Sequence, residues 1–170
     1  AASRLAGLFA VIYWGHVSGK KGKINTNYAL AKVRRAKTSR HYSASLVAQR
    51  LFQAKTLIRK HRYGDAVVCL TRIPQLGFAF ASKVCAFISG SECGVIDSVI
   101  VRQYPAFGFQ TRGGYVQNTP HNAAAYSKYC KCLQTEARKQ NRRGLRARWR
   151  DRDGSLHQWR AVDVERALYG

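Results

Sequence analysis

Apolar residues recur every three or four positions along most of this chain, which is the spacing of one buried face of an α-helix. The first stripe of this kind predicts a buried helix over residues 1–17. The following patterns predict a short helix over 27–36 and a longer helix that runs to about residue 61. Ser43 or Ser45 is expected to cap that longer helix, because a serine hydroxyl accepts a hydrogen bond from a first-turn N–H.

Glycine, proline and capping residues divide the rest of the chain. Gly64-Asp65 is expected to break the chain and to cap a two-turn helix over 66–72. The later pattern predicts, in order, a turn at 73–77, a helix at 78–88, a helix to 104 capped by Asp97, an irregular loop at 105–119, a helix from Thr119-Pro120 to about 141, and a last helix at 162–169 capped by Asp163. Strong strands and internal repeats are missing. The sequence therefore predicts an all-α protein folded as a single domain over residues 1–170.

Composition adds a strong charge bias to this helical pattern. The chain contains 30 Lys and Arg against 8 Asp and Glu, which gives a formal net charge of +22. Hydrophobic residues make up 46% of the chain, so the basicity is not that of a disordered tail. Because so large an excess opposes compaction by self-repulsion, it indicates a polyanionic partner. Nucleic acid is the first expectation, and an anionic membrane surface is the alternative.

The basic residues are concentrated in two flanks. Residues 1–62 contain no Asp or Glu, and residues 121–170 contain twelve Lys and Arg. Between residues 61 and 120 only five Lys and Arg occur. A nearly neutral, apolar middle between two basic flanks favours a protein that binds phosphates and acts at a central site over one that merely coats nucleic acid.

Several other classes of protein are disfavoured by the sequence. The five cysteines are odd in number and lack paired spacing, and Cys130 and Cys132 are too close together for tetrahedral zinc, so reduced thiols and no metal site are expected. The loop 19–23 lacks the lysine-serine ending of a phosphate loop, so no nucleotide cofactor is expected. Because no run of about 18 apolar residues occurs, no membrane span is expected. These features predict a monomer without a cofactor, located inside the cell in the cytoplasm or nucleoid, or in the nucleus if the source is eukaryotic.

Residues 65–104 are the most informative segment for function. They are expected to form a helix, a hairpin turn, a second helix, an extended link and a third helix opened by Asp97. In a helix-hairpin-helix the backbone N–H groups of the turn face outward together and can bind a DNA phosphate. Gly77 would allow the phosphate to come close to the backbone.

This segment resembles the helix-hairpin-helix DNA glycosylases, the superfamily of endonuclease III and 8-oxoguanine DNA glycosylase. The resemblance is carried by Ile73-Pro74-Gln75-Leu76-Gly77 and by Val95-Ile96-Asp97-Ser98. It implies an all-α, glycosylase-like helical fold and an enzyme that flips a damaged base out of double-stranded DNA and cuts its glycosidic bond. The implied base is an oxidised purine. On this reading Pro74, Gln75, Leu76, Gly77 and Phe78 bind DNA.

The resemblance also implies two catalytic residues, Lys83 and Asp97. Lys83 lies in an apolar helical run, where burial would lower the pKa of its amine and make it a nucleophile. It would attack the sugar and form a Schiff base, which gives lyase activity, while Asp97 stabilises positive charge on the sugar or activates the nucleophile. The sequence departs from the family at two positions. Gln75 occupies the position of the first glycine in the family's hairpin. Lys83 lies one helical turn beyond the position of the nucleophilic lysine in the family.

Simpler roles remain open for the same residues. Lys83 could be a lysine whose stem packs at an interface while its amine reaches water, and Asp97 could be only a helix cap. The aromatic residues Phe78 and Phe80 could stack on a base or belong to the core, and His16 could line a pocket. A noncatalytic module that binds nucleic acid through the hairpin is therefore the alternative function.

Overall fold

The computed structural model describes residues 2–17, 26–38 and 43–168, and over these residues the protein is mostly helical, as the sequence predicts. The loop 19–23 lies outside the described residues. The elements follow the chain as α1 (Ala2–Val17), α2 (Thr26–Thr38), α3 (Ala44–Arg59), α4 (Tyr63–Thr71), α5 (Phe78–Ile88), α6 (Ser98–Gln103), η2 (Pro105–Phe107), β1 (Thr111–Arg112), β2 (Tyr115–Val116), α7 (Pro120–Arg142), η3 (Leu145–Ala147), β3 (Trp149–Arg150), β4 (Leu156–His157) and α8 (Ala161–Leu168).

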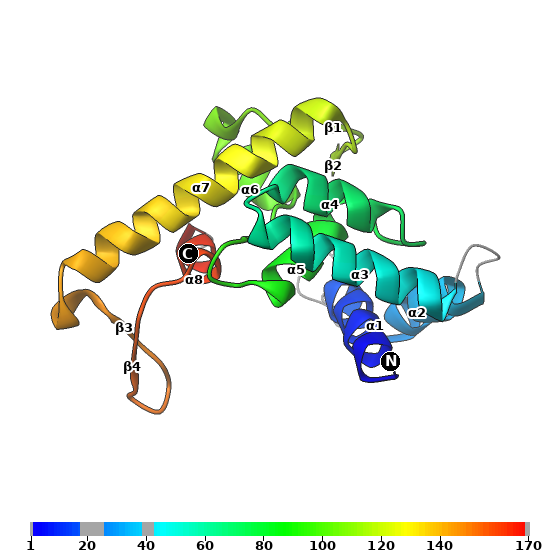
Figure 1. Cartoon of the computed structure of the whole chain (residues 1–170), viewed down its shortest axis with the longest axis horizontal. Helices are drawn as coiled ribbons and strands as arrows, with labels where there is room; N and C mark the ends of the chain where they lie inside the picture. The colour runs from blue at the N-terminus through cyan, green and yellow to red at the C-terminus, as the bar shows by residue number, and fades with distance from the viewer. Residues whose placement is uncertain (1, 18–25, 39–42, 169–170) are drawn as a thin grey trace.

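The other helices surround α4 and α5, both of which are apolar helices (Figure 1). Helix α3 packs along α4, the long helix α7 crosses α4, and α1 and α2 pack together beside α5. Helix α8 lies against α7, and the short ribbon of β3 and β4 extends away from the other elements. The core lies where α4 and α5 meet their neighbours, and its largest fully buried side chains include Tyr63, Phe78, Tyr126 and Tyr129.

Capping residues set the starts of three helices at the positions that the sequence predicts. The side chain of Ser43 accepts a hydrogen bond from Leu46 N, and that of Thr119 accepts one from Asn122 N. Asp97 accepts from two backbone N–H groups at the start of α6. Each cap satisfies N–H groups that the first turn of a helix leaves without a partner.

The predicted break at Gly64-Asp65 is wrong. Helix α4 begins at Tyr63 and includes both residues, and no side chain of the described part of the chain caps its start. Gly64 is needed for packing instead, because a Cβ at this position would collide with the backbone carbonyl of Ala123 in α7. The Gly64 N–H also donates to Ser127 Oγ at 2.9 Å. The glycine therefore lets α7 approach α4 closely.

Helix α7 holds the link between α5 and α6 in place. The hydroxyl of Tyr126 donates to the Gly94 carbonyl at 2.9 Å, and that of Tyr129 donates to the Val95 carbonyl at 3.0 Å. Gln134 donates to the carbonyl of Glu92 at 2.8 Å. Because these three bonds come from one long helix, they fix the backbone of the extended link just before Asp97.

Helix α8 docks on the same link from the other end of the chain. Val162 N donates to the Gly90 carbonyl at 3.0 Å, and the Tyr104 hydroxyl donates to the Leu168 carbonyl at 3.0 Å. Asp163 lies inside the first turn of α8 and accepts from Arg160 N at 3.0 Å, so it caps the helix from within rather than from the position before it. The last helix thus becomes part of the wall around residues 90–97.

The remaining segments are short. The predicted loop 105–119 contains one turn of 3-10 helix and the two-residue strands β1 and β2, which pair antiparallel. Four of the five cysteines are buried thiols and Cys132 is exposed; none forms a disulfide. In the described ranges, no group of three or more His, Cys, Asp or Glu is arranged to hold a metal ion. None of the described helices is both long and apolar enough to cross a membrane.

Candidate active site

The turn between α4 and α5 exposes its backbone and buries its apolar side chains. Ile73 and Leu76 are 2% and 3% exposed, whereas Gln75 and Gly77 are exposed. Gly77 occupies the N-cap position of α5, and within the described residues no side chain caps this helix start. A Cβ at Gly77 would meet no atom within 4 Å. The uncapped N–H groups therefore lie at an open surface, where a phosphate could reach them.

The five residues predicted to bind DNA do not contribute equally. Phe78 is 2% exposed and packs edge-on against Phe109 and Tyr126, so its side chain belongs to the core. Leu76 is buried as well. Only Pro74, Gln75 and Gly77 present atoms at the surface of the turn. A contact with DNA at Leu76 or Phe78 would have to involve the backbone.

Gln75 has a φ of 67°, which lies in the left-handed region that favours glycine. A Cβ is strained in this conformation, and glycine has none. Because the Gln75 side chain is exposed and makes little packing contribution, we expect Gln75→Gly to raise the free energy of unfolding by up to about 1 kcal/mol. Gln75→Ala, which keeps the strain, should leave stability nearly unchanged. Urea denaturation of the three chains tests this, and equal stabilities for the Gly and Ala variants would contradict it.

Lys83 lies on α5, one and a half turns from the exposed helix start. It is half-buried, and its amine lies 5.0 Å from the centre of the Phe80 ring. Burial lowers the pKa of Lys83, while the negative charges of Asp97 and Glu165 oppose that shift. Burial outweighs the two carboxylates, so the amine loses its proton more readily than an ordinary lysine does.

Ile96 and Ser82, which immediately precede Asp97 and Lys83, connect the two segments. Ile96 N donates to Ser82 Oγ at 3.0 Å, and the same hydroxyl lies 3.3 Å from the Ile96 carbonyl. Ser82 is fully buried, so these bonds are protected from water. Both backbone bonds that Asp97 accepts, from Val99 and Ile100, fall on Oδ1. The carboxylate thus caps α6 through one oxygen.

His16, from the end of α1, covers the same region of α5. Its ring stacks on Phe80 with centroids 4.4 Å apart and meets Tyr28 of α2 edge-on. Gly15 permits this packing, since a Cβ there would collide with the Phe80 ring. Burial lowers the pKa of His16, and the positive charges of Lys32 and Lys83 lower it further. His16 is therefore expected to be neutral at physiological pH.

Glu165 is the group that the sequence did not single out. It lies on α8 and is only 3% exposed. Burial raises its pKa to about 7, the charge of Asp97 raises it as well, and the Val95 N–H and the charges of Arg166 and Lys83 oppose the rise. Its position was hidden in the sequence, because Glu165 reaches the site only when α8 docks on residues 90–97.

The structure thus gathers His16, Lys83, Asp97 and Glu165 from α1, α5, the link before α6, and α8. Of the aromatic candidates, Phe80 adjoins Lys83, whereas Phe78 is part of the core. An amine with a lowered pKa, in a partly buried site beside carboxylates, is a group that can act as a nucleophile.

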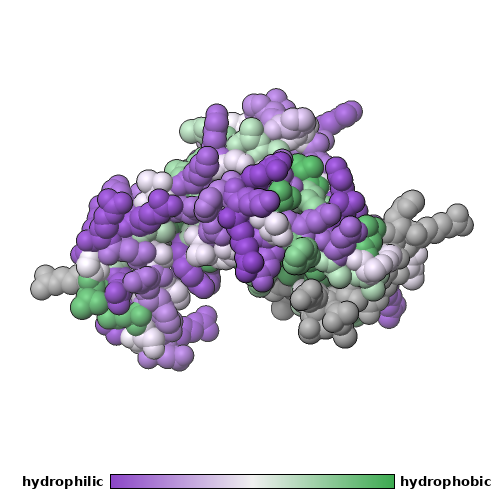
Figure 2. Space-filling view, in the orientation of Figure 1, coloured by the Kyte–Doolittle hydropathy of each residue, from purple (hydrophilic) through white to green (hydrophobic). Residues whose placement is uncertain are grey.

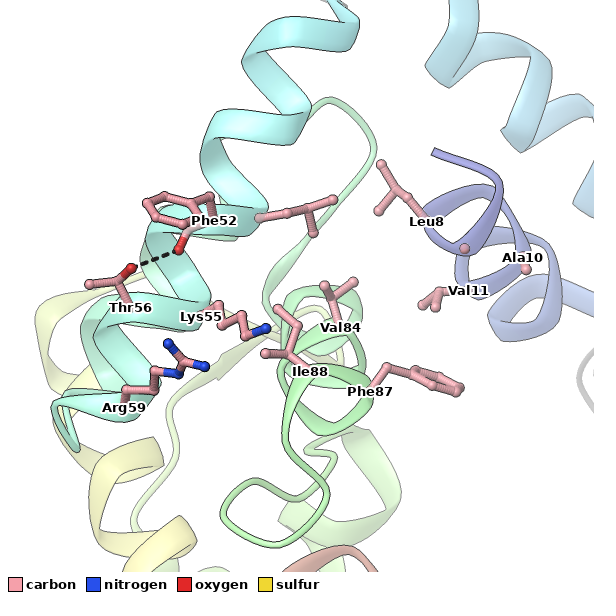
Figure 3. A pocket seen from close by; sticks show the side chains of 12 residues that line it. Leu8, Ala10, Val11, Phe52, Lys55, Thr56, Arg59, Val84, Phe87 and Ile88 are labelled. Atoms are coloured by element: carbon pink, nitrogen blue, oxygen red, sulfur yellow. Dashed lines mark hydrogen bonds between the residues drawn. The ribbon is translucent and has the colours of Figure 1, made fainter. Parts of the chain in front are cut away.

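An apolar groove with a volume of about 590 Å³ lies elsewhere, between α1, α3 and α5 (Figure 3). Leu8 and Val11 face Val84 and Ile88 across it, and Lys55 and Arg59 of α3 lie along its side. Neither Lys83 nor any carboxylate lines this groove. Because none of the four groups gathered around Lys83 lines it, the groove is separate from the candidate active site.

Basic side chains cover the surface near the end of α7 and the following ribbon. Figure 2 shows hydrophilic residues along α7 on the face in view. The exposed basic residues of this region are Arg138, Lys139, Arg142, Arg143, Arg150 and Arg152. Within the described part of the chain, Lys139 forms an ion pair with Glu136, and the other five form none. The region retains a high positive charge for a polyanion.

In a comparison with protein families, residues 1–169 match the family described as "Putative 8-oxoguanine DNA glycosylase OGG-like protein". No curated protein matches the chain, and no solved structure does.

Proposed function

Because the chain belongs to the OGG-like 8-oxoguanine DNA glycosylase family, we propose that it excises an oxidised purine base from double-stranded DNA. The family match covers nearly the whole chain, so the basic flanks are included as well as the segment 65–104. The observation that supports the proposal is the hydrogen bond from Ile96 N to the buried Ser82 Oγ, which joins the residues that precede Asp97 and Lys83.

In the proposed reaction the amine of Lys83 attacks the anomeric carbon of the flipped nucleotide. The new bond joins Nζ to that carbon, the glycosidic bond breaks, and its electron pair leaves with the base, which takes up a proton. Opening of the sugar ring then gives a Schiff base, from which lyase activity can follow. Asp97 places a negative charge beside the sugar, where positive charge develops as the base departs.

DNA would be held at two kinds of surface. The uncapped N–H groups at the start of α5 would bind a phosphate close to the flipped nucleotide. The arginines at the end of α7 and on the ribbon of β3 and β4 would bind phosphates further along the duplex. Both contacts are independent of base sequence, which suits an enzyme that must scan DNA for one kind of damage.

The proposal is tested with a panel of duplexes that each contain one modified base. We expect the chain to release free base from duplexes with an oxidised purine and not from undamaged duplex of the same sequence. Binding to every duplex without release of any base would contradict the proposal and would favour a noncatalytic nucleic-acid-binding module.

A further inference from the structure

The buried carboxyl of Glu165 lies among charged groups that the proposed reaction uses, yet that reaction assigns it no role. Elements around it come from three parts of the chain: α5 with Lys83, the link that ends at Asp97, and α8 itself. Glu165 is only 3% exposed, and burying a carboxyl group costs free energy. Its position therefore calls for an explanation.

Packing fixes the position of Glu165 closely. The Cβ of a side chain at Gly94 would lie 3.2 Å from the Glu165 Cβ, so the absence of a side chain at Gly94 lets α8 approach. Gly90 plays the same part for Val162, at 3.1 Å. The link that carries Asp97 and the helix that carries Glu165 are therefore in direct contact, held by α7 behind them through Tyr129.

We propose that Glu165 is the proton-accepting partner of Lys83, an inference that rests on the proposed glycosylase function. The carboxylate takes a proton from the Lys83 ammonium, which leaves a neutral amine and a carboxylic acid. The amine lone pair then forms the bond to the anomeric carbon. The glycosidic electron pair leaves with the base, and the base takes the proton from the carboxylic acid, which restores the carboxylate. When the ring opens, the nitrogen gives a second proton to the ring oxygen.

The environment of Glu165 suits this role. Its pKa of about 7 means that it can both accept and release a proton near neutral pH. The charged groups that face it are Lys83 from α5, Asp97 from the link, and Arg166 from α8 itself, while α7 presents the Tyr129 phenol to the same link. His16 faces Lys83 from α1. Asp97 and Glu165 thus divide the work, with Asp97 supplying charge and Glu165 carrying the proton.

The test uses duplex with an abasic site, because this substrate has no base for the protein to recognise. Borohydride reduces the Schiff base to a permanent protein–DNA crosslink. The fraction of crosslinked product that is lost in Lys83→Gln is the fraction formed by the Lys83 amine. We expect Glu165→Gln to slow this crosslinking at pH 8 by about 10²-fold, the usual effect of losing a general acid–base group. Glu136→Gln, which neutralises a carboxylate on the outside of α7, is the matched control and should crosslink like the wild type.

The pH profile separates proton transfer from structural support. Protonated Glu165 accepts no proton, so the wild-type rate should fall as pH is lowered through about 7, and Glu165→Gln should lack this limb. The wild-type profile alone can overturn the inference if the limb is missing, even if the variant fails to fold. Unchanged or faster crosslinking in a folded Glu165→Gln would also overturn it, since the carboxylate raises the pKa of Lys83.

Two further outcomes identify which proposal is wrong. If Glu165→Gln crosslinks normally at the abasic site but no longer releases an oxidised purine, Glu165 contacts the base. That result would overturn the proposed proton transfer from Lys83 to Glu165. A wild-type chain that gives no Lys83-dependent crosslink would overturn the proposed function, and the inference with it.

Discussion

Replacing Lys83 by glutamine should abolish the borohydride-trapped crosslink with damaged duplex while leaving DNA binding intact. The reason is that only an amine forms the imine that borohydride reduces, and glutamine has none. Glutamine keeps most of the aliphatic stem, which packs in the half-buried site beside Phe80. A change in folding should therefore be small, and melting temperatures of both chains check it.

The matched control is Lys131→Gln, an exposed lysine on α7, which should retain the crosslink. A crosslink that survives in Lys83→Gln would move the nucleophile to another amine and show that the assignment of Lys83 is wrong. Release of base without any crosslink, in the wild type as well, would indicate a monofunctional enzyme that activates water instead of forming a covalent intermediate. Denaturing gel electrophoresis of the reduced mixture separates these outcomes.

Replacing Asp97 by asparagine should slow the release of base by about 10²-fold or more while preserving DNA binding. Asparagine caps a helix as well as aspartate does, and its amide oxygen can accept the bonds from Val99 and Ile100. The substitution therefore removes the negative charge and keeps the cap. We expect the free energy of unfolding to change by less than about 0.5 kcal/mol.

Asp97→Ala removes both the charge and the cap, and it provides the comparison. It should slow base release to the same extent as Asp97→Asn and should also lower the free energy of unfolding by about 1 kcal/mol. If Asp97→Asn turned over normally and only Asp97→Ala were impaired, Asp97 would be a structural cap without a role in the reaction. Single-turnover rates and thermal melting on the same preparations decide between the two.

Several local features followed from the sequence because short-range chemistry determines them. Caps were predicted at Ser43 or Ser45, at Thr119 and at Asp97; the structure places the first at Ser43 and confirms the other two. The all-α class followed from helical spacing and is also confirmed. Capping and periodicity depend on residues within one or two turns, so the sequence alone contains the information.

The start of α4 shows where local reasoning fails. A glycine beside an aspartate resembles a break followed by a cap, and the sequence offers no reason to prefer another reading. In the structure the same glycine lies inside α4, since α7 passes so close that any side chain would collide with the Ala123 carbonyl. The residues concerned are about sixty positions apart, and a pattern within a few turns does not report such a contact.

The sequence by itself determined that Lys83 lies in an apolar helical run and that Asp97 opens a helix, and it left open whether the two meet. Only the tertiary structure placed them together, through Ser82 and Ile96, and added His16 and Glu165 from near the two ends of the chain. The physical reason is that a proton affinity depends on burial and on neighbouring charge. Both are properties of the packed protein, so a glutamate in an unremarkable final helix becomes a group that titrates near pH 7 only after α8 docks.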